Sequence, residues 1–141
     1  MTIEWDAVIV ENVFLAVIIV GTIYLETWIQ RKTQQRRDKE MLKHIIALIT
    51  SDLQGKLRFI EESIKYNDYK PFFTNIWDAV ILSGRHTLFP FEKIQDLEHT
   101  YSWMKYYNTE LQSNKLDENV LNDILEDVRK SINQSINLQL N

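Results

Sequence analysis

The sequence has no cysteine, only two prolines and only three glycines among its 141 residues. The absence of cysteine excludes a disulfide framework, a thiolate zinc site and a cysteine nucleophile. Because turn-rich β-sandwiches and barrels depend on glycine and proline, the scarcity of both favours long helices. The formal net charge is −4, which argues against a general nucleic-acid binder, because such a protein needs a basic face.

The sequence also lacks the motifs of familiar enzyme sites. No glycine-rich phosphate loop, nucleophile elbow or metalloprotease motif occurs in it. The three histidines, His44, His86 and His99, have no metal-ligand partner at helical spacing. We therefore expect no catalytic residue, no cofactor, no metal, no nucleic acid and no small-molecule substrate, and we expect that the chain is not an enzyme.

A long apolar run lies near the N-terminus. From Ala7 to Leu25 only one polar pair, near the start, interrupts it, and a bilayer core of ~30 Å needs about 20 mainly apolar helical residues. Trp5 and Trp28 bracket the run, and a helix of that length separates them by about 35 Å, the spacing of two aromatic belts. Residues 1–30 are therefore predicted to be a transmembrane anchor, with the tryptophans as interfacial anchors; the alternative is the buried core helix of a soluble protein.

Four bases follow the apolar run at once, whereas Glu4 and Asp6 are the only charges before it. These bases are Arg31, Lys32, Arg36 and Arg37. The positive-inside rule then places the N-terminus outside and the rest of the chain in the cytoplasm. Each base near an anionic leaflet contributes about 1 kcal/mol of binding free energy to that leaflet. Residues 31–38 are therefore predicted to be a basic juxtamembrane linker that contacts headgroups.

Polar residues lie along one side of the predicted membrane helix. At about 100° per residue, this side carries Glu11, Ile18, Thr22 and Glu26. A charge at the depth of Glu11 is costly, and a polar stripe is typical of a helix that packs against another helix. We therefore predict that Glu11 and Thr22 serve assembly in the membrane. The alternative is that Glu11 is protonated or extends to the interface.

Residues 39–141 are predicted to be a cytoplasmic helical domain. Apolar residues recur there at three- and four-residue spacing, which predicts helices over about 39–66, 74–82, 90–112 and 120–136. Whether the first of these continues from the membrane helix or swivels at the glutamines stays open. Each helix has one apolar face, so together they must form a bundle or be covered by partners. The predicted fold class is all-α, with one N-terminal transmembrane helix followed by three longer helices and one short one.

Turn-forming residues separate these helices. Pro71, preceded by an Asn-Asp pair, ends the first helix. Thr74 is expected to cap the short helix, and Gly84 is expected to close it in the left-handed conformation. Pro90 fits the first turn of the next helix, which should break near Ser113. These turn-forming residues therefore predict where the helices begin and end.

Aromatic residues concentrate between Tyr66 and Tyr107. Most of them are expected to anchor the core around the short helix. In the stretch YSWMKYYN, however, aromatic rings occur on several sides of the predicted helix, which is more than one buried face needs. Trp103, Tyr106 and Tyr107 are therefore predicted to bind a protein partner.

The stretch FFTNIWDAVILSGRHTLFPFEKIQDLEHTYSWMKYYN contains a Phe-Thr-x-x-Trp-like entry, a Ser-Gly turn, a leucine-rich segment and a Tyr-to-Asn helix. The positions that carry this order are Phe73, Thr74, Trp77, Ser83, Gly84, Leu88, Leu97, Tyr101 and Asn108. The order resembles that of uncharacterised prokaryotic and viral single-pass membrane proteins with a cytoplasmic helical domain. Pro90 followed by Phe91 departs from the usual leucine-rich turn. The resemblance implies a membrane-tethered helical domain and brings no known activity and no catalytic residue.

Two functions without catalysis are compatible with this pattern. In the first, the chain is a membrane-anchored interaction or accessory module that concentrates a binding face near a membrane-protein partner. In the alternative, it is a self-assembling membrane-active protein, holin-like or pore-forming, with Glu11 at the contact between copies. The expected partners are the lipid bilayer and either a membrane protein or further copies of the chain. An enzyme with an unrecognised constellation, involving His86 or His99, is a third hypothesis.

Overall fold

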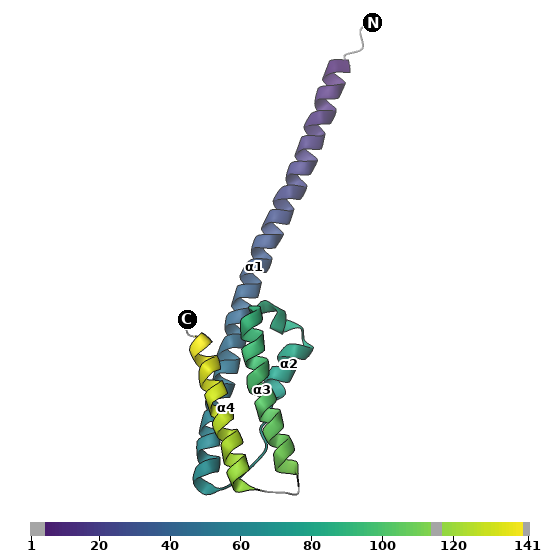
Figure 1. The fold of residues 1–141 in the computed structure, drawn as a ribbon. Helices are drawn as coiled ribbons and strands as arrows, with labels where there is room; N and C mark the ends of the chain where they lie inside the picture. Colours follow the sequence, from purple (N-terminus) through teal and green to yellow (C-terminus); the bar gives the residue numbers. More distant parts are fainter. Residues whose placement is uncertain (1–4, 114–116, 140–141) are drawn as a thin grey trace. The chain divides into compact units, whose positions relative to one another are not determined.

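The computed structural model describes residues 5–113 and 117–139, and these ranges are all-helical, without a strand. The elements are α1 (Trp5–Tyr66), α2 (Asn75–Leu82), the short 3-10 helix η1 (Arg85–Leu88), α3 (Phe91–Gln112) and α4 (Glu118–Gln139) (Figure 1). The predicted all-α class and the long apolar N-terminal helix are thus confirmed.

The chain divides into two units, Met1–Met41 (unit 1) and Leu42–Asn141 (unit 2). Helix α1 contributes to both, and it passes through residues 31–38 without a break in its hydrogen-bonding pattern. The glutamines of the basic segment are therefore helical. Gly55, which weakens a helix, does not end this one.

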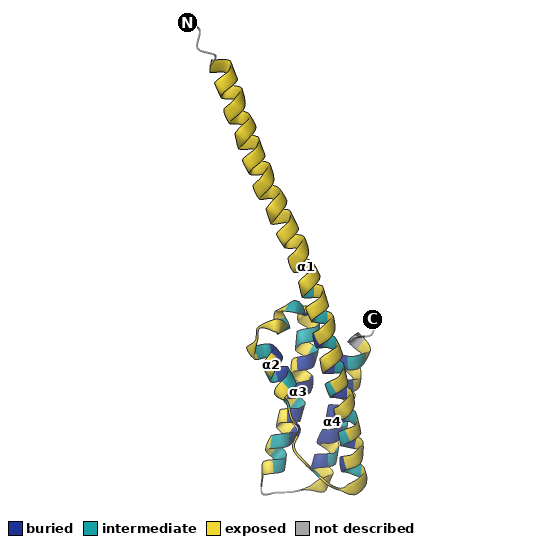
Figure 2. Cartoon of the chain, turned by 180° about the vertical axis from the view of Figure 1, so that it is seen from behind, coloured by how far each residue is buried: buried dark blue, intermediate teal, exposed yellow. Residues whose placement is uncertain are grey.

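Unit 1 has no packed interior among its described residues. Every side chain from Trp5 to Arg37 is exposed, and Figure 2 shows this part of α1 in yellow throughout. Apolar residues predominate in it up to Ile29. A single helix has no second element against which these side chains could be buried.

The ends of the helices in unit 2 follow their turn residues. Helix α1 ends at Tyr66, and the next residue, Asn67, has a positive φ of 51°, which asparagine tolerates better than most residues. Gly84 adopts the left-handed conformation at φ 72° directly after α2, where a side chain would be strained. Pro90 precedes the first residue of α3, and Ser113 follows its last. The predicted helix ends are confirmed at these places.

The core of unit 2 combines residues from all four α-helices. The second part of α1 lies beside α3 and α4, and α2 lies beside α3 (Figures 1 and 2). The most deeply buried apolar side chains are Ile49, Leu53 and Ile60 of α1, Trp77 of α2, Leu97 and Met104 of α3, and Leu125, Val128 and Ile132 of α4. Their three- and four-residue spacing is the amphipathic pattern by which the sequence predicts these helices.

Polar contacts fix two further places in unit 2. Thr100 Oγ1 lies 2.8 Å from the hydroxyl oxygens of both Ser131 and Ser135, so three small hydroxyl side chains satisfy one another inside the contact between α3 and α4. The Phe72 N–H donates to Asn108 Oδ1 at 2.7 Å, and Asn108 Nδ2 donates to the Phe72 carbonyl at 2.9 Å. The Asn108 amide therefore holds the segment before α2 against α3.

Candidate functional site

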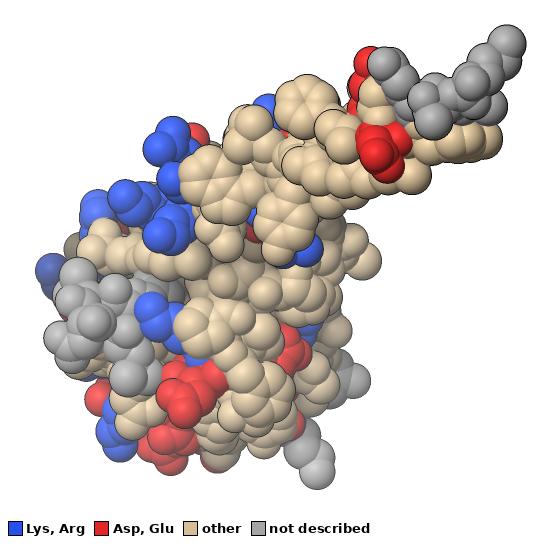
Figure 3. All heavy atoms as spheres, turned by 90° about the horizontal axis from the view of Figure 1, so that it is seen from above, with Lys and Arg blue, Asp and Glu red and all other residues tan. Residues whose placement is uncertain are grey.

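The first part of α1 is an exposed apolar surface. It is long and apolar enough to cross a membrane by length and composition, and none of its most apolar 18-residue window is buried. Trp5 and Trp28, which bracket it, are 62% and 54% exposed. Figure 3 shows acidic side chains beside the grey N-terminal end, followed by an uncharged stretch. Aromatic side chains thus lie where the apolar surface begins and ends.

Glu11 and Thr22, the residues predicted to serve assembly, are both exposed. The Thr22 hydroxyl donates to the Ile18 carbonyl at 2.8 Å, so its one donor is used within its own helix. Among the described residues, Glu11 has no hydrogen-bond or ion-pair partner. Glu11 is therefore an ionisable group of this segment that needs a partner or an aqueous environment.

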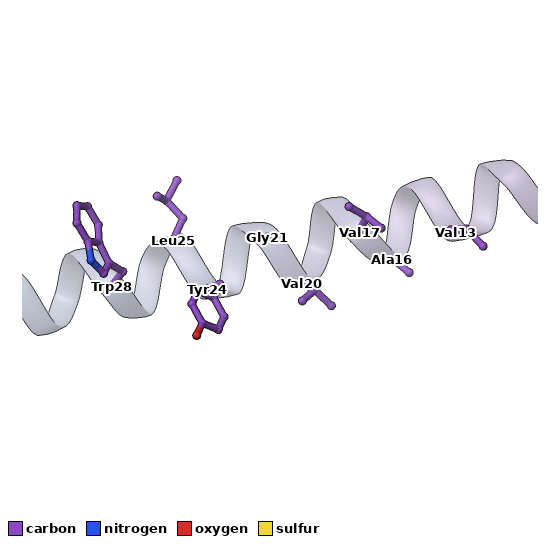
Figure 4. A pocket seen from close by; sticks show the side chains of 8 residues that line it. All are labelled: Val13, Ala16, Val17, Val20, Gly21, Tyr24, Leu25 and Trp28. Atoms are coloured by element: carbon purple, nitrogen blue, oxygen red, sulfur yellow. The ribbon is translucent and has the colours of Figure 1, made fainter.

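One face of this segment is concave. It is lined by Val13, Ala16, Val17, Val20, Gly21, Tyr24, Leu25 and Trp28. In Figure 4 the backbone is bare at Gly21, between the side chains of Tyr24 and Val20 along the helix. A Cβ atom added at Gly21 would meet nothing within 4 Å. The surface of this face is therefore shallowest at Gly21, where the backbone is not covered by a side chain.

The four predicted headgroup-contacting bases follow on the same helix. Arg31, Lys32, Arg36 and Arg37 are all exposed. Lys32 Nζ lies 4.4 Å from the centroid of the Trp28 ring, a cation–π contact. The predicted interfacial tryptophan and the first bases therefore form one amphipathic border at the end of the apolar surface.

A second candidate site lies on α3, where His99, Ser102, Trp103 and Tyr106 line a shallow hollow. Trp103 Nε1 donates to His99 Nε2 at 3.0 Å, and the Trp103 ring makes an edge contact with Tyr106 at 5.8 Å between centroids. Tyr106 is 47% exposed and Trp103 is half-buried. We call His99, Trp103 and Tyr106 the α3 aromatic patch. Two of the three predicted partner-binding residues are therefore accessible and adjacent.

Tyr107 does not belong to this patch, because it is fully buried. Its ring packs edge-on against Phe72 at 5.1 Å, and its hydroxyl has no hydrogen-bond partner among the described residues. Burial raises the pKa of Tyr107 to about 12. Position 107 continues the buried face of α3 through Thr100 and Met104, whereas Trp103 and Tyr106 lie outside it. The prediction that Tyr107 is an exposed binding residue is therefore wrong.

The sequence interpretation missed a buried polar triad in unit 2. Asp52 Oδ1 accepts from Lys56 Nζ at 2.6 Å, and Asp52 Oδ2 accepts from the Tyr101 hydroxyl at 2.7 Å. Lys56 is only 8% exposed, and burial, together with the hydrogen bond to Asp52, raises the pKa of Tyr101. Trp77 stacks on the Tyr101 ring with 5.7 Å between centroids. The only signal in the sequence is an Asp and a Lys four residues apart beside the apolar face of α1.

This triad borders a groove of about 420 Å³ on the surface of unit 2. Asp52, Lys56 and Ser51 supply its polar atoms, and Gly55 leaves it open, since a Cβ there would meet nothing within 4 Å. Its apolar walls are Leu48, Phe59, Pro71, Phe72, Phe73 and Ile76. Phe73 is 75% exposed at this rim. We call this site the Lys56 groove.

No group of three or more side chains that could hold a metal ion occurs in the described part of the chain. Comparison of the chain with protein-family models, curated proteins and solved structures gives no match. Its function therefore has to be inferred from its own residues: the apolar surface of unit 1, and the α3 aromatic patch and the Lys56 groove of unit 2.

Proposed function

We propose that this chain is a membrane-anchored interaction module, with unit 1 as a single-pass anchor and unit 2 as a partner-binding domain. The observation that carries the proposal is the exposed apolar part of α1 between two tryptophans. Each large apolar side chain gains about 1.5–3 kcal/mol on leaving water, and unit 1 provides no interior for these side chains. A bilayer supplies that environment. The alternative of a buried core helix is disfavoured, since the apolar window has no buried residue.

The orientation that we propose has the N-terminus outside and unit 2 in the cytoplasm. It is supported by Arg31, Lys32, Arg36 and Arg37, which all follow the apolar segment, and by the acidic residues before it. The same bases, all exposed, would contact anionic headgroups.

Labelling of introduced cysteines tests the anchor and its orientation together, because the chain has no cysteine of its own. Two single variants, Asp6→Cys and Lys39→Cys, place a thiol at exposed positions on either side of the apolar segment. In intact cells, an impermeant maleimide should modify only the first, and the second should react after permeabilisation. Reaction of the second variant alone would reverse the orientation. Reaction of both in intact cells, or release of the chain by carbonate, would overturn the anchor.

The partner-binding role is proposed for the α3 aromatic patch. Exposed Trp and Tyr side chains are typical anchors of protein interfaces, and the edge contact between Trp103 and Tyr106 holds both rings in place. The test is the mass and composition of the complex extracted from its native membrane in mild detergent. A second protein in fixed ratio should be recovered, and the double variant Trp103→Ala/Tyr106→Ala should lose it. The control is Tyr66→Ala, which removes an exposed tyrosine elsewhere in unit 2. A complex that survives the double variant would remove the patch from the proposal.

Self-assembly in the membrane is a second candidate, because unit 1 has a concave face around Gly21 and an unpartnered Glu11. Small residues permit close approach of membrane helices, and polar side chains hydrogen-bond between them. In this case the extracted complex should contain only copies of this chain. The Glu11→Leu and Gly21→Leu variants should then reduce its mass, and expression of the native chain should lower the membrane potential. An intact potential and a monomeric mass would exclude this candidate.

A further inference from the structure

The Lys56 groove has no role in the function proposed above. All its residues belong to unit 2, between Leu48 and Phe59 of α1 and the segment from Pro71 to Ile76. The inference below therefore does not depend on whether unit 1 is inserted in a membrane.

The polar end of the groove offers hydrogen-bond donors. An ammonium group carries three N–H donors, and in the structure Lys56 Nζ donates to a single acceptor, Asp52 Oδ1. Both oxygens of Asp52 already accept a hydrogen bond, one from Lys56 and one from Tyr101. A molecule in the groove would therefore find spare donors at Lys56, and it would need an oxygen that accepts.

The charge of this end favours an uncharged acceptor. Asp52 and Lys56 neutralise each other, and their side chains are only 12% and 10% exposed. A carboxylate brought to Lys56 would lie close to the Asp52 carboxylate, and two like charges at a partly desolvated site disfavour each other. A carbonyl oxygen can accept from Lys56 without that cost.

The size and lining of the groove favour a small apolar molecule over a protein. Its volume of about 420 Å³ lies within the ~300–1,000 Å³ typical of small-molecule pockets. A stable protein interface needs about 800 Å² from each partner, which is more surface than one short groove provides. Its walls are three phenylalanines and three further apolar residues, which suit a hydrocarbon chain.

We propose that the Lys56 groove binds an uncharged acyl lipid, such as a fatty amide or ester. Its carbonyl oxygen accepts a hydrogen bond from Lys56 Nζ, and its hydrocarbon chain lies along Phe59, Phe72 and Phe73. The open space above Gly55 admits the chain.

The test uses the full chain in lipid nanodiscs and a long-chain fatty amide that carries a diazirine near the end of its chain. After photolysis, mass spectrometry should find saturable labelling of the peptide that contains Phe73, and unlabelled fatty amide should compete with it. The Gly55→Leu variant fills the groove and should abolish this labelling. The matched control Gln54→Leu adds the same side chain at the neighbouring exposed position, outside the groove, and should leave the labelling unchanged.

A second pair of measurements tests the role of the carbonyl. The double variant Asp52→Leu/Lys56→Met removes the Lys56 donors, adds no new one, and leaves no unpaired buried charge. It should weaken binding of the amide about tenfold, the loss expected for a hydrogen bond to a charged group. An alkyl diazirine without a carbonyl should label the native chain and this variant equally.

Three outcomes would overturn the proposal: labelling near Phe73 that does not saturate, equal labelling of native and Gly55→Leu chains, or tighter binding of the free fatty acid than of its amide. Labelling of residues 5–28 in the same samples reports separately on the membrane anchor. A failure of the groove and a failure of the anchor are therefore distinguishable.

Discussion

The two parts of α1 contain the same kinds of apolar residue with opposite exposure. In unit 1, Leu15 and Ile19 are 55% and 57% exposed, whereas Ile49 and Leu53 in unit 2 are fully buried. The difference lies in their arrangement. In unit 1 the apolar residues occur on nearly all sides of the helix, but in unit 2 they are confined to one face, which other helices cover. Residue type alone therefore does not decide whether a side chain is buried; in unit 2 other helices cover the apolar face of α1, whereas unit 1 has no second described element that could do so.

The largest expected effect comes from placing charges in the apolar part of α1. The double variant Leu15→Arg/Ile19→Arg adds two arginines near the middle of the proposed span, each at a cost of about 2.5–3.5 kcal/mol on insertion scales. The variant should lose its carbonate-resistant membrane fraction, while near-ultraviolet circular dichroism should show that unit 2 stays folded.

The matched control for that variant, Gln54→Arg/Glu61→Arg, adds the same two side chains at exposed positions of the second part of α1. It should remain in the membrane. If the Leu15→Arg/Ile19→Arg chain also stays in the membrane fraction after carbonate extraction, insertion in a bilayer does not explain the exposed apolar residues of the first part of α1.

The next largest effect concerns the buried triad. Asp52→Ala leaves Lys56 buried without its ion-pair partner, and the free energy of unfolding should fall by about 3–5 kcal/mol. The double variant Asp52→Leu/Lys56→Met should recover most of this loss, because neither charge remains. Denaturant unfolding followed by near-ultraviolet circular dichroism measures both. The exposed control Asp123→Ala should change stability by no more than about 0.5 kcal/mol, and a similarly small loss for Asp52→Ala would mean that the triad contributes little.

Alkaline pH should destabilise unit 2 through its buried tyrosines. The pKa of Tyr107 is raised from 10.0 to about 12, and burial raises that of Tyr101 too. Below pH 10 the folded and unfolded chains both keep the Tyr107 proton; between 10 and 12 only the folded chain keeps it. The free energy of unfolding should therefore fall as pH rises through this window, by up to about 3 kcal/mol for Tyr107.

A pH series of denaturant midpoints measures this effect. The Tyr107→Phe variant should flatten part of the alkaline fall, whereas Tyr106→Phe, which alters an exposed residue, should not. An alkaline fall of equal size in the native chain and in Tyr107→Phe would contradict the contribution of Tyr107.

The smallest expected effect separates the two neighbouring tyrosines at neutral pH. Because the Tyr107 hydroxyl is buried without a partner among the described residues, Tyr107→Phe should raise the free energy of unfolding by about 1 kcal/mol. Tyr106→Phe should leave it unchanged. A loss of stability in Tyr107→Phe would reveal a partner, such as a buried water, for this hydroxyl.

The helices could be predicted from the sequence because their signals are local. The spacing of apolar residues gives the helices of unit 2, and the residues around Tyr66, Gly84 and Pro90 give their ends. The accessibility of Trp103 and Tyr106 could also be predicted, because a helix with aromatic rings on several sides cannot bury all of them. Insertion in the membrane, its orientation and the partner stay predictions.

The remaining features depend on contacts between residues far apart in sequence. The direction in which the apolar face of α3 points decides that Tyr107 is buried while Tyr106 is exposed. Because this stretch has aromatic residues on several sides of the helix, the spacing of its apolar residues does not show which of two neighbouring positions faces the core. The Asp52–Lys56 spacing is common on solvated helix faces. Only the approach of Tyr101 from α3, 49 positions away, turns it into a buried triad. The Lys56 groove likewise needs the segment after α1 to return along that helix.

The double hydrogen bond between Asn108 and the Phe72 backbone has a consequence for the order of folding. Phe72 lies in a segment without regular secondary structure, and its two backbone groups are satisfied by a side chain 36 positions further along the chain. Those two hydrogen bonds can form only once α3 has folded and lies against this segment. The rim of the Lys56 groove should therefore be among the last parts of the domain to be completed during folding, and among the first to open when α3 moves.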